Sequence, residues 1–176
     1  MTEPFKGTIK LDVRDSVADW TPYTLKKTPE GAPNILVILY DDTGQASWSP
    51  YGGRINMPTL DRLAGNGLTY TQWHTTALCS PTRSTFLTGR NHHVNRCASI
   101  TEGSNGFPGA AGRLPAECAT IGQVLQDNGY STYWIGKNHN VPVEDISACG
   151  NRSEWPLSKG FDRFYGFLGG ETNNWY

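Results

Sequence analysis

The expected fold depends on the stretch Asn34-Ile35-Leu36-Val37-Ile38-Leu39-Tyr40, which Asp41-Asp42-Thr43-Gly44 follow directly. A continuous apolar run rich in branched residues is typical of a central strand buried on both faces. Acids at the carboxyl end of such a strand lie where open α/β sheets bind their ligands, and adjacent carboxylates suit calcium or magnesium. We therefore predict a buried strand over residues 34–40 that ends at a ligand site. An aspartate that caps a turn explains the same pair of acids equally well.

Strand and helix signals alternate through the rest of the chain. Apolar residues on one helical face predict helices, while alternation of apolar and polar residues predicts strands. The pattern gives a helix at 58–64, a strand at 68–74, a helix at 81–88, a long loop at 91–117, a helix at 120–128 and a strand at 130–135. This alternation indicates an α/β sheet. We read 1–32 as a lead-in segment that packs on the domain, and 33–176 as the domain itself, cut before its end.

Composition limits the classes of function. The chain has 176 residues, and 15 basic against 16 acidic residues leave a net charge of -1. Such a balance gives no general field for nucleic acid or an anionic membrane, so we expect neither as a partner. No apolar run approaches the roughly 18 residues of a membrane span, and the start lacks the pattern of a signal peptide. We therefore expect a cytoplasmic protein.

The segment Cys79-Ser80-Pro81-Thr82-Arg83 combines a thiol with the start of the predicted helix at 81–88. Free backbone N–H groups and the helix dipole favour an anion at such a place, and Arg83 can reach it. A buried structural cysteine is the alternative explanation. The remaining cysteines form no CxxC pair, so we expect reduced structural thiols at Cys97, Cys118 and Cys149.

The stretch from Cys79 to Arg90, CSPTRSTFLTGR, resembles the signature of the sulfatase family. Segments 33–42, 57–64, 134–139 and 160–162 resemble further parts of that family in the same order, and bacterial arylsulfatases are the most similar type. The resemblance implies an α/β fold like that of alkaline phosphatase, a sandwich with a large mixed, mainly parallel sheet between helices. Residues 33–176 would form only its amino-terminal part.

The resemblance also implies a set of site residues. Cys79 would be converted to formylglycine by a formylglycine-generating enzyme, and its hydrate would be the nucleophile. Its oxygen and the carboxylates of Asp41 and Asp42 would bind a divalent metal, calcium or alternatively magnesium. The remaining residues act on the sulfate, the hydrate or the rest of the substrate: Arg83 and Lys137 on the anion, His139 on the hydrate and its proton, and His93 on the substrate.

The implied activity is that of a sulfuric ester hydrolase of the arylsulfatase type, which acts on a small sulfate ester. The family commonly has a tryptophan between the lysine and the histidine, whereas Asn138 stands between Lys137 and His139 here. Further metal ligands of the family are not found in the sequence, so we expect these 176 residues alone to be inactive. Two alternatives stay open: a phosphate or phosphonate ester hydrolase of the same superfamily, and a non-catalytic metal- or anion-binding module.

Overall fold

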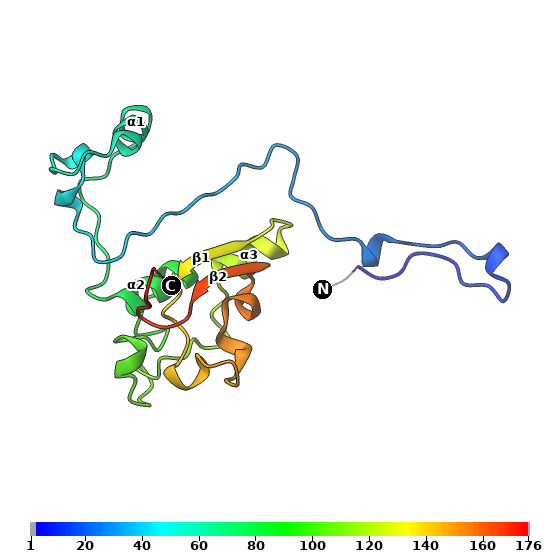
Figure 1. The fold of residues 1–176 in the computed structure, drawn as a ribbon. Coiled ribbons are helices and arrows are strands. Elements are labelled where there is room, and N and C mark those ends of the chain that lie inside the picture. The colour runs from blue at the N-terminus through cyan, green and yellow to red at the C-terminus, as the bar shows by residue number, and fades with distance from the viewer. Residues whose placement is uncertain (1–2, 176) are drawn as a thin grey trace.

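The computed structural model describes residues 3–175, which contain three α-helices and two β-strands (Figure 1). The helices are α1 (Pro58–Asn66), α2 (Cys79–Thr88) and α3 (Ile121–Asp127). The strands are β1 (Tyr133–Lys137) and β2 (Arg163–Phe167), and short 3-10 turns lie between many of these elements. The order of elements fits the α/β class.

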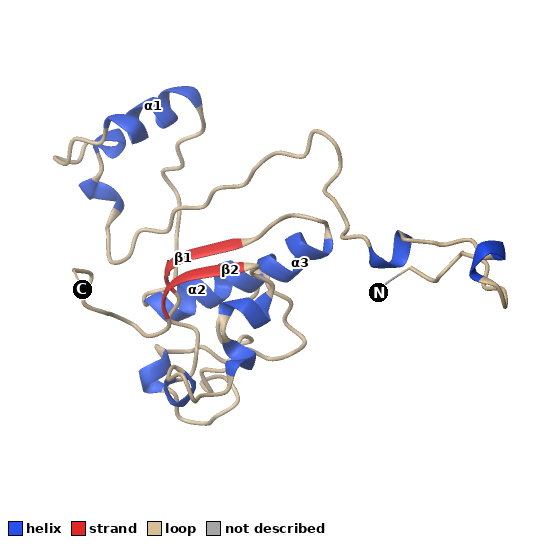
Figure 2. Cartoon of the chain, turned by 45° about the vertical axis from the view of Figure 1, so that its right-hand side comes forward, coloured by secondary structure: helices blue, strands red, loops and turns tan. Residues whose placement is uncertain are grey.

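The two strands form a parallel sheet in which Tyr133 pairs with Arg163 and Lys137 with Phe167. The pairing continues beyond β1, because the N–H of Asn138 donates to the carbonyl of Phe167 and the N–H of His139 to that of Leu168, at 3.0 and 3.1 Å. Helices α2 and α3 lie on one side of this sheet (Figure 2). The residues from Lys137 to His139 therefore continue the line of β1, and His139 lies beside the first residue of α2.

A small apolar core holds these elements together. Leu87 of α2 packs with Cys97, Leu114 and Phe161, while Ile121 and Trp134 contact this cluster from α3 and β1. The rings of Trp134 and Phe161 meet edge to face, with centroids 5.2 Å apart. Burial of these side chains holds α2 next to β1. The residues that follow β1 therefore lie beside the amino-terminal end of α2.

The helices follow their local sequence signals closely. Helix α3 begins with a capping box in which Thr120 and Gln123 satisfy each other's backbone N–H groups. Helix α2 ends at Gly89, whose φ of 65° lies in the left-handed region that favours glycine. Helix α1 runs slightly beyond the predicted 58–64. Helix α2 begins two residues earlier than predicted, so Cys79 is its first residue and does not precede it.

Two predicted strands are wrong in this structure. Residues 34–40 are extended but have no backbone hydrogen bond to any part of the chain that the structure describes, and Leu36 is 84% exposed. Residues 68–74 are irregular, and Leu68 and Trp73 are exposed. The apolar pattern alone is not sufficient, because a strand also needs neighbours that satisfy its N–H and C=O groups. The expected large sheet is thus a two-stranded sheet within residues 3–175.

Strand β2 was not predicted, although its sequence Arg-Phe-Tyr-Gly-Phe is rich in the aromatic residues that strands favour. The strand predicted at 130–135 is β1, which begins and ends slightly later. The predicted loop at 91–117 is irregular apart from one short 3-10 turn at Thr101–Gly103. Its most important residue for the site, Glu102, lies in that turn.

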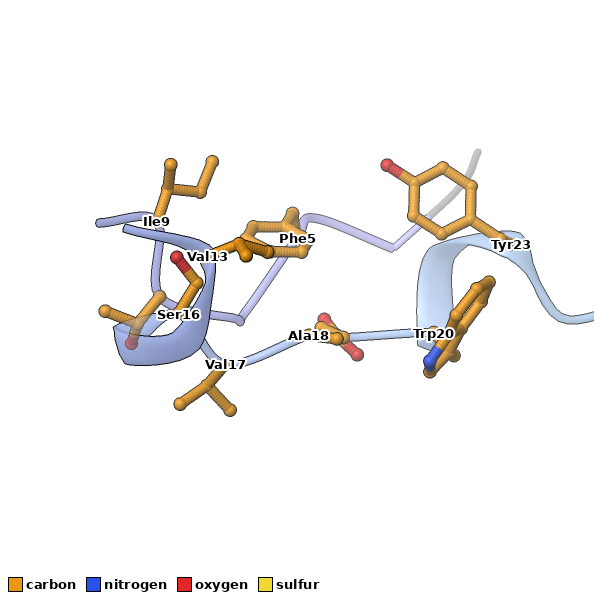
Figure 3. Close-up of a pocket in the computed structure, with 10 residues that line it drawn as sticks. Phe5, Ile9, Val13, Ser16, Val17, Ala18, Trp20 and Tyr23 are labelled. Atoms are coloured by element: carbon orange, nitrogen blue, oxygen red, sulfur yellow. The ribbon is translucent and has the colours of Figure 1, made fainter. Parts of the chain in front are cut away.

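The lead-in extends away from the sheet and helices (Figure 1). Its first part bends back on itself through an antiparallel bridge between Thr8 and Val17, and apolar side chains line a hollow of about 330 Å³ there (Figure 3). Its later part contacts the domain, because Lys26 Nζ donates to the carbonyl of Asp127 at 2.8 Å. No helix within residues 3–175 has the length and apolar character needed to cross a bilayer.

Candidate active site

Three predicted site residues meet through one carboxylate. Arg83 Nη2 donates to Asp41 Oδ1 at 3.1 Å, and Lys137 Nζ donates to Asp41 Oδ2 at 2.8 Å. Arg83 also donates from Nη1 to the carbonyl of Lys137 at 2.8 Å, which ties α2 to the end of β1. The guanidinium is buried, with 6% of its side chain exposed. Two cations held by a helix and a strand thus face one anionic group.

A second chain of contacts begins at Cys79. Its Sγ lies 3.1 Å from His139 Nδ1, and the opposite ring nitrogen, Nε2, lies 2.7 Å from Glu102 Oε2. Cys79 is half-buried at the first position of α2, whereas the His139 side chain is only 4% exposed. Glu102 reaches the ring from the loop between α2 and α3. Position 79 therefore has a histidine nitrogen within hydrogen-bond distance.

A side-chain contact joins the segment after β1 to α2. Asn140 Nδ2 donates to the carbonyl of Ser80 at 2.9 Å, so the chain beyond β1 is fastened to the first turn of α2. His139 has a φ of 56°, an unusual backbone conformation for a non-glycine residue. Asn138, which replaces the family's common tryptophan, is buried, and its Oδ1 accepts from the N–H of Asn140 at 3.0 Å. The substitution leaves Lys137 and His139 within the cluster.

The local charges lower the pKa of both acids in the cluster. Burial raises the pKa of Asp41, but the hydrogen bonds and positive charges of Lys137 and Arg83 together lower it below its ordinary value. Burial likewise raises the pKa of Glu102, and its hydrogen bonds to the His139 ring, to the backbone and to the Thr101 hydroxyl more than offset this. Both carboxylates are therefore anionic near neutral pH.

Asp41 and Asp42, the acids expected to bind metal, offer the right type of ligand, because hard divalent cations prefer carboxylate oxygens. Asp42 is exposed and has a φ of 50°, and both oxygens of Asp41 are paired with Arg83 and Lys137. Within residues 3–175, no three His, Cys, Asp or Glu side chains are grouped as a metal site would require. Asp41 and Asp42 thus fit as part of a ligand set, and an ion at Asp41 has to displace its ion pairs.

His93, the predicted substrate residue, is not joined to this cluster. It is exposed, its ring lies tilted against that of His92 with centroids 4.3 Å apart, and its backbone N–H donates to Asn91 Oδ1. The hollow in the lead-in shares no residue with the cluster either. The predicted site residues that contact one another therefore lie around the start of α2 and the end of β1.

Sequence reasoning missed Glu102. It lies in a loop without periodicity, 23 positions after Cys79 and 37 before His139, so no spacing rule connects the three. The one available signal was that Glu102 is an acid in a long loop, and long loops often carry functional residues.

The family model described as Sulfatase matches residues 33–176, and the chain belongs to that family. An uncharacterized sulfatase of Schizosaccharomyces pombe is 33% identical over 85% of this chain and 27% of its own length. Human arylsulfatase D is 38% identical over 81% of this chain and 24% of its own length. The chain thus spans about a quarter of the length of these curated relatives.

The crystal structure of Ps i-CgsB is similar to this fold, with a TM-score of 0.55 and 29% identity. The similarity covers 76% of this chain and 27% of that protein. The chain accordingly forms a small α/β part, with parallel strands, of the alkaline-phosphatase-like fold of sulfatases.

Proposed function

We propose that the whole protein hydrolyses sulfate monoesters as an arylsulfatase, with Cys79 converted to formylglycine and a divalent metal ion at Asp41 and Asp42. The observation that carries the proposal is the position of Cys79. It begins α2, has His139 Nδ1 at 3.1 Å, and lies one helical turn before Arg83. A nucleophile, a proton acceptor and cationic groups therefore occur together.

His139 is suited to move the proton that ends the reaction. A hydrated aldehyde at position 79 supplies one hydroxyl that attacks sulfur and displaces the alcohol of the ester. Deprotonation of its second hydroxyl then expels sulfate and restores the aldehyde. His139 Nδ1 lies within reach of a group on this side chain, so it can accept that second proton. The contact from Nε2 to Glu102 leaves Nδ1 free for this role.

Arg83 and Lys137 are suited to hold the sulfate. This role is supported by their position, because both side chains converge on the carboxylate of Asp41 and so lie close enough to share one anionic group. The planar fork of Arg83 matches a tetrahedral oxyanion, and the ammonium of Lys137 adds a positive charge. Together they offset charge that moves onto the sulfate oxygens as the ester bond breaks.

The metal ion belongs with Asp41 and Asp42. When bound, a divalent cation such as calcium neutralises sulfate charge and makes a nearby hydroxyl more acidic. The proposed partners are a small sulfate ester and, for maturation, a formylglycine-generating enzyme; the proposed location is the cytoplasm.

Rates on aryl sulfate and aryl phosphate esters test this function in the whole protein, co-expressed with a formylglycine-generating enzyme. We expect turnover of the sulfate ester, its loss in Cys79→Ala, and a slower chemical step in Lys137→Ala. The variant Cys149→Ala, which changes an exposed cysteine, is the matched control and keeps full activity. Faster turnover of the phosphate ester would instead indicate a phosphate ester hydrolase, and full activity in Cys79→Ala would contradict the proposal.

A further inference from the structure

Glu102 and Gly170 enclose the side of the His139 ring that faces away from Cys79. We infer that they are positioning residues, which fix the imidazole with Nδ1 toward position 79 and the proton on Nε2. The role of Nδ1 as proton acceptor in the reaction rests on the proposed function, whereas the orientation of the ring does not.

Glu102 sets the tautomer. A neutral imidazole carries one proton, and an anionic carboxylate can only accept a hydrogen bond. Because Glu102 Oε2 lies 2.7 Å from Nε2, the proton of a neutral His139 is on Nε2. Nδ1 then presents its lone pair to the group on residue 79, whose sulfur lies 3.1 Å away.

Gly170 leaves the space that the ring occupies. A methyl group at this position would lie 2.7 Å from Cε1 and 2.8 Å from Nε2 of His139, closer than side-chain carbons approach other atoms. It would also lie 3.2 Å from Glu102 Oε1. Any larger residue at position 170 therefore displaces the ring or breaks its contact with Glu102.

The backbone of His139 is also held in an unusual conformation. Its φ of 56° costs of order 1 kcal/mol for a non-glycine residue, so surrounding contacts have to maintain it. The N–H of His139 donates to the carbonyl of Leu168, two residues before Gly170. The segment that follows β2 thus holds both the backbone and the ring of this residue.

Steady-state kinetics of the whole, formylglycine-containing protein provide the first test. We expect Glu102→Gln to lower kcat about 10- to 100-fold with KM unchanged, because an amide can donate to Nε2 and favour the wrong tautomer. Gly170→Ala should act in the same direction. Glu117→Gln changes an acid that is 76% exposed, and Gly169→Ala adds a methyl group with no atom within 4 Å, so both serve as matched controls with unchanged kcat.

Nitrogen NMR of the protein with 15N-labelled histidine provides a second test, which requires no enzymatic activity. We expect the proton of neutral His139 on Nε2 in the parent and its partial transfer to Nδ1 in Glu102→Gln. Unchanged kcat in Glu102→Gln, or a parent protonated on Nδ1, would overturn the inference. If the parent fails to hydrolyse sulfate esters but shows the Nε2 proton, the proposed function fails and the positioning role stands.

Discussion

The substitution Asp41→Asn tests whether one carboxylate joins the extended 34–41 segment to α2 and β1. It keeps the shape of the side chain but removes the charge that faces Arg83 and Lys137, at 3.1 and 2.8 Å. A hydrogen bond to a charged group contributes about 1.5–3 kcal/mol, and the exposure of Asp41, 39% of its side chain, weakens both bonds by roughly half. We therefore expect the free energy of unfolding to fall by about 2 kcal/mol.

The pH dependence of this effect follows from the sign of the pKa change. The pKa of Asp41 is lower in the folded chain than its ordinary value of 3.8, so its stabilising effect is present above that value. The effect is lost as the pH falls through the folded pKa. The parent and Asp41→Asn should accordingly differ most near neutral pH and converge in strong acid.

Urea denaturation followed by tryptophan fluorescence measures the difference, because Trp134 lies against the core. Asp42→Asn is the matched control, since this adjacent carboxylate is exposed and forms no ion pair within the described residues. It should change the free energy of unfolding by about 0.5 kcal/mol or less. Equal losses in the two variants, or no loss in either, would show that the Asp41 carboxylate does not stabilise the fold through Arg83 and Lys137.

Three further predictions concern the thiols, the core and the isolated chain. Burial raises the pKa of Cys97 to about 11, so iodoacetamide under mildly alkaline conditions should label exposed Cys149 before Cys97. Peptide mapping that finds Cys97 labelled before Cys149 would contradict this. Leu87→Ala should lower the free energy of unfolding by about 2–5 kcal/mol and the exposed control Leu157→Ala by much less; equal urea midpoints would refute this. We expect the 176-residue chain alone to show no aryl sulfate turnover, because a calcium ion takes about six or more oxygen ligands and Asp41 and Asp42 supply only two carboxylates. Metal-dependent turnover that Cys79→Ala abolishes would show otherwise.

Short-range sequence signals predicted helices α2 and α3, whose ends depend on contacts between residues close together in the chain. The glycine after α2 and the capping box of α3 mark ends that short-range hydrogen bonds determine, and the sequence carries both. Strand 34–40 shows the opposite case. Its apolar pattern is strong, but strand formation depends on partner strands that are distant in sequence, and the described residues provide none.

The candidate site divides in the same way. Cys79 and Arg83 lie one turn apart on α2, and Lys137 and His139 lie together at the end of β1, so sequence motifs find both pairs. The position of Glu102 depends on the path of an irregular loop, for which the sequence has no periodic signal. Only the fold brings its carboxylate to His139.

Mass spectrometry of the tryptic peptide 63–83, after co-expression with a formylglycine-generating enzyme, determines whether Cys79 is converted to formylglycine. This peptide contains Cys79 as its single cysteine. We predict the mass decrease and the hydrazide reactivity that follow from conversion of the cysteine side chain to an aldehyde. A peptide that keeps the free thiol under these conditions would contradict the assignment of Cys79 as the precursor of the nucleophile.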